Sequence, residues 1–264
     1  MQDLNISLVQ SPIYWEDKNA NLDHFGRILA EMVSVTDLIV LPEMFNTGFT
    51  MNAQANSEDM DGPTVTWMAG MAKTMACVIC GSLIIREKEN FYNRLVWMRP
   101  DQTYDYYDKK HLFRMGDEHL HYSSGKKSLV VTLKGWKVMP LICYDLRFPV
   151  WSKNRYDDGE YLFDFLLYVA NWPAVRSVAW HTLLRARAIE NMAYVAGVNR
   201  TGIDGRGYEY GGGSAVVAPD GSVVCSGNDL PEALVQCELL KAPLTEIRDK
   251  LGVGNDWDGF DIHQ

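Results

Sequence analysis

A short apolar run that ends at a cysteine constrains this chain more than any other feature of its sequence. Residues 138–142 have the length and apolar character of a buried β-strand. Cys143 follows directly, and the polar residues and Pro149 after it do not continue the strand. Sharp turns at the carboxyl ends of strands are where open α/β sheets expose a functional side chain. Taken alone, however, the run favours a small buried thiol over a nucleophile, because most free cysteines are small buried hydrophobes.

Length and composition are those of a globular protein. The chain has 264 residues, 47% of them hydrophobic, which is enough for one large α/β domain or two smaller ones. Its net charge of −9 argues against nucleic acid and anionic membranes as partners, since both attract basic surfaces. No apolar run approaches the roughly 18 residues of a membrane span. The first residues lack the basic and apolar regions of a signal peptide, so we expect a cytoplasmic protein.

The cysteines predict neither disulfides nor a shared metal. There are five of them, an odd number spread widely along the chain, and thiols stay reduced in the cytoplasm. Cys77 and Cys80 form a C-x-x-C pattern, but they lie within a strand-like run over residues 76–85. Because strand side chains alternate between faces, these two thiols are expected on opposite sides of a sheet.

Apolar periodicity divides the chain into many short strands and a few helices. Strand-like runs lie at residues 4–9, 38–41, 76–85, 91–98, 104–108, 128–133, 137–142, 165–170, 194–198, 213–217, 223–226 and 233–238. Helices are expected after Asp17 and over residues 63–75, 150–157, 180–191 and 239–250, and residues 202–213 are expected to form a glycine-rich loop. Adjacent strands after two strand–helix units indicate a mixed sheet. The even spread of strands predicts one domain over residues 1–264, with a tail from about residue 251.

Glu43 stands just past the end of a second buried strand. Pro42 ends the run over residues 38–41, and apolar residues flank the carboxylate on both sides. A poorly solvated carboxyl group has a raised pKa, which suits a general base. Glu43 therefore fits either a base at the same sheet edge as Cys143 or a solvated carboxylate on a loop.

The polar stretch over residues 109–121 allows three interpretations. It fits a solvated loop. It also fits a metal site, although the spacing matches no zinc signature. The candidate ligands would be His111, His119 and His121, with Asp117 or Glu118. In the third interpretation, a lysine and a glutamate from this stretch serve Cys143, because a reactive thiol needs a nearby cation and a base.

Three motifs, in order, resemble those of a known superfamily. Leu41-Pro42-Glu43, residues 107–113 and residues 142–149 resemble the glutamate, lysine and cysteine motifs of the nitrilase (carbon–nitrogen hydrolase) superfamily. Further likeness at residues 171–173, 186–191 and 199–200 is similar to the omega-amidase branch. The resemblance covers nearly the whole chain. It changes the expected role of Cys143 from a core residue to a nucleophile.

The resemblance implies a fold and a set of roles. The fold is a four-layer α-β-β-α sandwich of two mixed β-sheets, and relatives commonly form homodimers without a cofactor. Cys143 would attack a carboxamide, with Glu43 as the base. Lys110, oriented by Glu118, would face the oxyanion beside the backbone N–H of Tyr144. The register of the resemblance selects Lys110 over its neighbour Lys109, which the residue pattern alone does not distinguish.

The omega-amidase likeness also implies a substrate class. Such an enzyme would act on a small 2-oxo dicarboxylate monoamide, such as 2-oxoglutaramate or 2-oxosuccinamate. A buried carboxylate needs a cationic partner, and arginine offers a bidentate one. Arg147 is the candidate, and its alternative role is a structural salt bridge, for instance to Asp145.

Four other functions stay open at this point. A nitrilase or another aliphatic amidase would use the same residues. A cysteine–histidine hydrolase would use His181 or His111 in place of Glu43 as the base. A metal hydrolase would use the histidines of residues 109–121. A non-catalytic binding protein would leave the three motifs without a role.

Overall fold

Two six-stranded mixed sheets form the centre of the molecule. The computed structural model describes residues 2–228 and 230–262. The first sheet has the strand order β16-β1-β2-β3-β4-β5. Its strands are β1 (Leu4–Gln10), β2 (Leu38–Val40), β3 (Val78–Glu87), β4 (Asn90–Met98), β5 (Tyr104–Asp108) and β16 (Ala233–Leu239). Strands β1, β2 and β3 are parallel to one another, and the other strands of this sheet pair antiparallel with their neighbours.

The second sheet repeats this plan, with order β15-β14-β11-β10-β7-β6. Its strands are β6 (Val131–Leu133), β7 (Trp136–Ile142), β10 (Phe165–Ala170), β11 (Tyr194–Asn199), β14 (Ala215–Val217) and β15 (Val223–Ser226). The central strands β7, β10 and β11 are parallel. Two short hairpins stand apart: β8 (Tyr156–Asp157) with β9 (Glu160–Tyr161), and β12 (Thr201–Ile203) with β13 (Glu209–Gly211).

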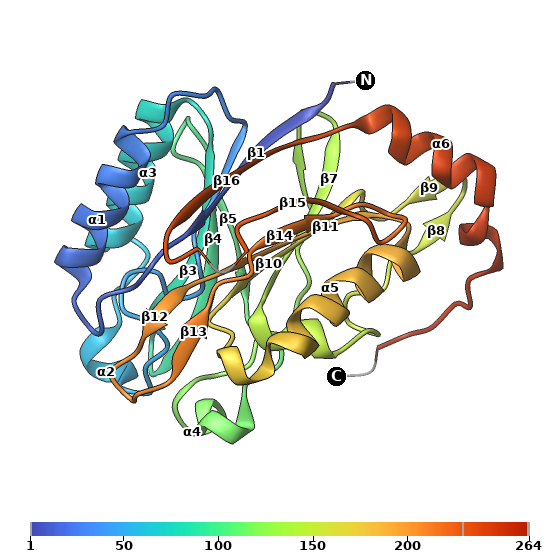
Figure 1. The fold of residues 1–264 in the computed structure, drawn as a ribbon. Helices are drawn as coiled ribbons and strands as arrows, with labels where there is room; N and C mark the ends of the chain where they lie inside the picture. Colours follow the sequence, from blue (N-terminus) through green and yellow to red (C-terminus); the bar gives the residue numbers. More distant parts are fainter. Residues whose placement is uncertain (1, 229, 263–264) are drawn as a thin grey trace.

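Helices cover the outer faces of both sheets. Helices α1 (Lys18–Ala30) and α3 (Pro63–Met75) lie on the first sheet, at the left of Figure 1, and α5 (Ser177–Asn191) lies on the second. Helix α6 (Lys241–Leu251) continues from β16 and is fixed near the start of β10, where Arg248 bonds to Asp164. The remaining helical turns are α2 (Ala53–Asn56), α4 (Glu118–His121), η1 (Arg114–Gly116), η2 (Cys143–Arg147), η3 (Ala174–Arg176) and η4 (Val253–Asp256). The predicted four-layer α-β-β-α sandwich is confirmed.

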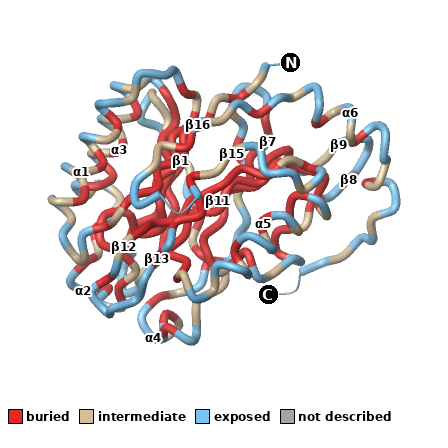
Figure 2. Tube along the Cα trace, viewed as in Figure 1, coloured by how far each residue is buried: buried red, intermediate tan, exposed pale blue. Residues whose placement is uncertain are grey.

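The core explains why the strands are apolar on both faces. Leu38 and Val40 face the second sheet, while Ile39 between them faces the helices. Buried residues therefore follow the strands through the centre of the molecule, and most exposed residues lie on the outer helices and loops (Figure 2). Cys80 lies in the cluster between the sheets and Cys77 in the cluster under the helices, so their predicted placement on opposite faces is confirmed.

Two local predictions are wrong. Residues 150–157 form a turn and strand β8, because the buried side chain of Asn154 bonds to the backbone of Phe163 and Asn191 and holds the segment extended. Most of the expected glycine-rich loop over residues 202–213 belongs to the hairpin of β12 and β13, which begins at Thr201. Helix α1 begins as predicted, with the Asp17 carboxylate accepting a hydrogen bond from the Ala20 backbone N–H.

The residues after α6 pack against the body of the protein. The ammonium of Lys153 lies 3.7 Å from the centre of the Trp257 ring. The carbonyl of Phe260 accepts a hydrogen bond from Arg155. The division into one domain with a tail stays a prediction. Within the described residues, no helix has the length and apolar character needed to cross a membrane.

Candidate active site

Cys143 occupies a strained turn at the end of β7. It is the first residue of η2 and has a φ angle of 43°, in a region that costs a non-glycine residue roughly 1 kcal/mol or more. Its thiol lies 3.8 Å from the carbonyl oxygen of Asn171, which follows β10. The buried carboxylate of Asp145 closes the turn by accepting hydrogen bonds from the Ile142 N–H and the Tyr107 hydroxyl. The sequence therefore forms the elbow that was predicted at this strand end.

Glu43 lies fully buried at the matching edge of the first sheet, so the alternative of a solvated carboxylate is wrong. Its Oε1 atom accepts hydrogen bonds from Lys109 Nζ and Asn93 Nδ2, both at 2.8 Å. Its Oε2 atom accepts one from the backbone N–H of Asn171, also at 2.8 Å. Asn171 thus contacts both the carboxylate from the first sheet and the thiol from the second.

The lysine of this cluster is Lys109, and the prediction of Lys110 is wrong. Lys109 Nζ lies 2.8 Å from Glu43 Oε1 and 2.9 Å from Glu118 Oε2. Lys110 instead extends over the ring of Trp151, with its ammonium 5.3 Å from the ring centre. The physical reason is strand alternation. The backbone N–H of Lys109 donates to the backbone carbonyl of Asn93 and so continues the hydrogen-bond ladder between β4 and β5. The Lys109 side chain is therefore buried on the same face as that of Tyr107, and Lys110 points to the other face.

The predicted Glu118 is part of the cluster. Its Oε1 atom lies 3.0 Å from Lys109 Nζ, and its Oε2 atom accepts the Phe113 N–H at 2.6 Å. Burial raises the pKa of Glu118, and the Lys109 ammonium opposes that rise. Burial would lower the pKa of Lys109, but Glu118 and Glu43 outweigh it and raise this pKa above its ordinary value. Lys109 is therefore held as a cation.

Cys143 rests as a neutral thiol. Burial raises its pKa well above the ordinary value, and the negative charge of Glu43 raises it further, while Lys109 acts in the opposite direction. A neutral thiol must lose its proton as it attacks, and Glu43 is the adjacent carboxylate. The arrangement suits base-assisted attack better than a preformed thiolate.

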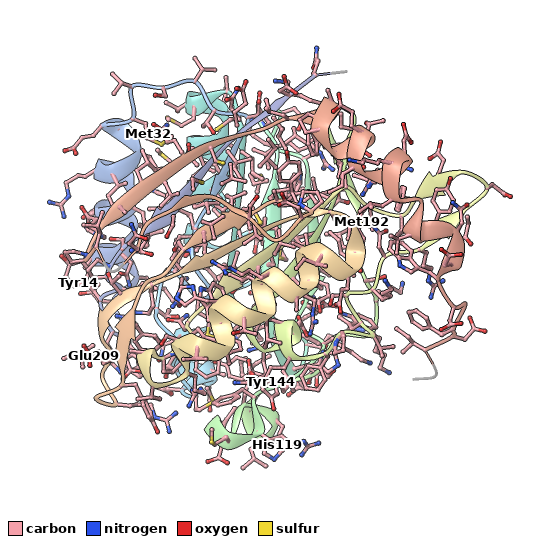
Figure 3. All side chains as sticks on the ribbon, turned by 45° about the vertical axis from the view of Figure 1, so that its right-hand side comes forward. Tyr14, Met32, His119, Tyr144, Met192 and Glu209 are labelled. Carbon is pink, nitrogen blue, oxygen red and sulfur yellow. The ribbon has the colours of Figure 1, made fainter. Side chains whose placement is uncertain are left out.

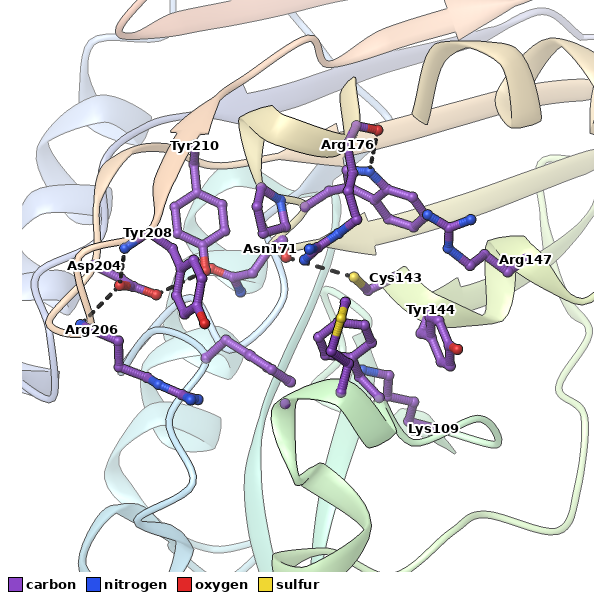
Figure 4. A pocket seen from close by; sticks show the side chains of 16 residues that line it. Lys109, Cys143, Tyr144, Arg147, Asn171, Arg176, Asp204, Arg206, Tyr208 and Tyr210 are labelled. Carbon is purple, nitrogen blue, oxygen red and sulfur yellow. Dashed lines mark hydrogen bonds between the residues drawn. The ribbon is translucent and has the colours of Figure 1, made fainter. Parts of the chain in front are cut away.

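A cavity of about 220 Å³ opens onto Cys143. Figure 4 shows its lining, in which aromatic side chains surround the thiol. The aromatic residues are Phe49, Phe113, Tyr144, Trp172, Tyr208 and Tyr210. Among the described lining residues Asp204 is the one acid, and hydrogen bonds from the Arg206 N–H, the Tyr208 N–H and the Tyr210 hydroxyl occupy its oxygens.

Three arginines also line the cavity: Arg147, Arg176 and Arg206. The Arg147 guanidinium lies 4.9 Å from the centre of the Trp172 ring, and that of Arg176 lies 5.2 Å from the Phe113 ring. The described structure shows no salt bridge from Arg147 to Asp145, whose oxygens are bonded elsewhere. Our sequence interpretation missed Arg176 and Arg206. Arg176 could have been predicted from the sequence, because this residue closely follows the end of the predicted buried strand over residues 165–170.

The histidines take other positions. The ring of His111 is stacked on Phe148 and bonds to Asp145 through Nδ1 at 2.8 Å. His181 is exposed on α5, and neither histidine lines the cavity. Figure 3 shows His119 on α4, at the edge of the molecule. Within residues 2–228 and 230–262, no group of three or more His, Cys, Asp or Glu side chains is arranged to hold a metal ion.

Comparison with known proteins identifies the family of the chain. The profile of the carbon-nitrogen hydrolase family matches residues 5–249. The chain belongs to this family. The resemblance read from its three motifs is thereby confirmed, and the chain is a hydrolase of carbon–nitrogen bonds.

Individual relatives are similar over nearly their full length. Omega-amidase YafV of Escherichia coli (strain K12) is 46% identical over 98% of this chain and 99% of its own. The 2-oxoglutaramate amidase of Bacillus subtilis (strain 168) is 32% identical over 95% and 96%. The crystal structure of XC1258 from Xanthomonas campestris, a CN-hydrolase superfamily protein with an arsenic adduct in its active site, is 44% identical, covers 100% of both chains and has a TM-score of 0.97.

Replacing Glu43 tests the electrostatics of the thiol. We expect Glu43→Gln to lower the pKa of Cys143, because it removes a negative charge that disfavours the thiolate, while Lys109 keeps its positive charge. The thiolate absorbance of each protein should be followed as the pH is raised, with Cys143→Ala in the same background as the blank. An unchanged or higher pKa of Cys143 in Glu43→Gln would contradict the effect of the Glu43 charge on the thiol.

Proposed function

We propose that this protein is an omega-amidase. It would hydrolyse the terminal carboxamide of a small 2-oxo dicarboxylate monoamide, such as 2-oxoglutaramate or 2-oxosuccinamate, to the acid and ammonia. One observation carries the proposal: the buried cluster of Cys143, Glu43, Lys109 and Glu118 lies at a small cavity whose lining includes three arginines.

The first half of the reaction forms an acyl-enzyme. The Cys143 sulfur attacks the amide carbon, and Glu43 accepts the thiol proton. The Lys109 ammonium, oriented by Glu118, and the backbone N–H of Tyr144 face the oxyanion, and such donors commonly contribute about 3 kcal/mol each. The carbon–nitrogen bond then breaks, and Glu43 returns the proton to the departing nitrogen, which leaves as ammonia.

The second half releases the acid. A water oxygen attacks the carbonyl carbon of the thioester, and Glu43 accepts a proton from that water molecule. The carbon–sulfur bond breaks, and the proton returns to the sulfur of Cys143. The carboxylate product leaves, and the thiol is restored in its neutral resting form.

The charge of the cavity supports an acidic substrate. Arg147, Arg176 and Arg206 line it, and its one described acid, Asp204, has its oxygens occupied by other donors. A guanidinium binds a carboxylate with two parallel hydrogen bonds. The names of the relatives, omega-amidase and 2-oxoglutaramate amidase, support the same substrate class. We propose that Arg147 binds the free carboxylate of the substrate.

A nitrilase would use the same four residues on a nitrile, so it is the second candidate. The amidase names of the relatives favour the amide. Assay of the nitrile that corresponds to each amide discriminates the two, since a nitrilase would hydrolyse the nitrile faster.

We also propose that the enzyme acts in the cytoplasm as a homodimer. The five cysteines are free, which fits a reducing compartment in which a thiol nucleophile stays active. The dimer rests on the likeness to the superfamily, and light scattering during size-exclusion chromatography measures it directly.

Ammonia release tests the proposed reaction. We expect the wild type to release ammonia from 2-oxosuccinamate and 2-oxoglutaramate, and Cys143→Ala to release none above background. Lys109→Met should lose about 100-fold or more in kcat, because it removes an oxyanion donor, whereas Lys110→Met should stay close to the wild type. The two lysine variants are matched controls for each other.

Two results would contradict this assignment. A folded wild type that releases no ammonia from either amide would remove the omega-amidase proposal and leave the family membership intact. Equal losses in Lys109→Met and Lys110→Met would show that the position of the ammonium in the buried cluster is not what matters.

Replacing Arg147 tests recognition of the carboxylate. Arg147→Lys keeps the charge and loses the bidentate geometry, so KM for the 2-oxo acid amides should rise about tenfold or more. KM for neutral aliphatic amides should stay the same, because they carry no carboxylate. If both substrate classes were affected equally, Arg147 would have no role in substrate selection.

A further inference from the structure

The side chain of Asn93 lies between the two carboxylates of the site. Asn93 is a fully buried residue of β4, and its Nδ2 atom lies 2.8 Å from Glu43 Oε1 and 3.3 Å from Glu118 Oε1. Its backbone carbonyl accepts the N–H of Lys109 at 3.0 Å. One residue therefore contacts all three charged members of the cluster, although it carries no charge and was not part of any recognised motif.

A second buried residue sets the orientation of this amide. Ser82 Oγ accepts the backbone N–H of Met44 at 2.9 Å, and its own proton is donated to Asn93 Oδ1 at 2.8 Å. The Nδ2 group of Asn93 must then face the carboxylates. If the amide were flipped, its Oδ1 atom would face the carboxylates of Glu43 and Glu118, which repel it. Its Nδ2 group, a donor, would then face the Ser82 hydroxyl, which now donates to Oδ1.

These bonds also determine which oxygen of Glu43 is open to a proton. Oε1 accepts from both Lys109 and Asn93, so both of its acceptor positions are occupied. Within the part of the chain that the structure describes, Oε2 accepts one backbone hydrogen bond, from the N–H of Asn171, whose carbonyl lies beside the thiol of Cys143. Oε2 therefore keeps a second acceptor position, and it is the carboxylate oxygen bonded to the residue that also contacts the nucleophile.

We propose that Asn93, held by Ser82, is a positioning residue that separates Glu43 from Glu118 and directs the Cys143 proton to Oε2 of Glu43. This inference rests on the proposed function for its kinetic test. Asn93 acts through Glu43 and does not contact the substrate, since it does not line the cavity. Its loss should therefore reduce kcat and leave substrate binding nearly unchanged.

Two substitutions separate hydrogen bonding from packing. Asn93→Asp preserves the shape of the side chain but replaces the amide donors, and Asn93→Ala removes both donors and volume. We expect each to reduce kcat on the 2-oxo acid amides about 100-fold, as a small displacement of a catalytic group does, with KM changed less than about threefold. An Asn93→Asp enzyme with the kcat of the wild type would overturn the proposal, because packing alone would then suffice.

A buried asparagine outside the site supplies the control. Asn154 is equally inaccessible, and its Nδ2 donates to the backbone carbonyls of Phe163 and Asn191. Asn154→Asp should lower the melting temperature and leave kcat unchanged. If Asn93→Asp does not fold, Ser82→Ala replaces it, because it removes the hydrogen bond that holds Oδ1 of Asn93 in place, and a kcat loss of about tenfold is expected. Full kcat in a folded Ser82→Ala would overturn the proposal.

A thiol reagent separates this inference from the proposed function. Methyl methanethiosulfonate contains no carboxamide, and its reaction forms a mixed disulfide at the Cys143 sulfur and releases methanesulfinate. The thiol proton still has to reach Glu43, so modification of Cys143, followed by peptide mass, should slow about tenfold in Asn93→Asp. An inactive wild type with this slowing would overturn the proposed function alone. Equal modification rates in the two proteins would overturn the role of Asn93.

Discussion

The site depends on one buried cation shared by two carboxylates. Lys109 Nζ contacts Glu43 and Glu118, and all three side chains are almost completely removed from solvent. Buried charges are costly unless they are paired and hydrogen-bonded, and removing one partner of such a group commonly costs several kcal/mol. Asn93, Asn171 and the Phe113 N–H supply the remaining hydrogen bonds. The cluster is thus stable only in the folded arrangement that also brings it beside Cys143.

The four-layer fold explains how residues distant in the sequence meet. Glu43 and Lys109 follow strands of the first sheet, while Cys143 and Asn171 follow strands of the second. Packing the sheets face to face brings these strand ends together, and Asn171 links them by donating to Glu43 and accepting from Cys143. Nucleophile and base therefore come from opposite sheets, so their distance depends on the packing of the apolar core between them.

Local patterns in the sequence predicted the strands, Glu43 and the elbow at Cys143, because each depends on short apolar runs and on where they end. The register of the motif misplaced the lysine by one residue, and strand alternation selects Lys109 only once the structure shows that Tyr107 is buried. Asn93 and Arg206 were out of reach. Their roles arise from contacts between segments far apart in the chain, and a polar residue within a strand or a glycine-rich hairpin carries no local sign of them.

In the proposed reaction, Cys143 carries the acyl group of an acidic amide. Rapid acid quenching during turnover of 2-oxosuccinamate, followed by peptide mass measurement, tests it most directly. We predict an adduct on the peptide that contains Cys143, with the mass of the substrate less ammonia, and none in Cys143→Ala. Turnover with that peptide unmodified and an adduct at another residue, or turnover by Cys143→Ala, would contradict the account.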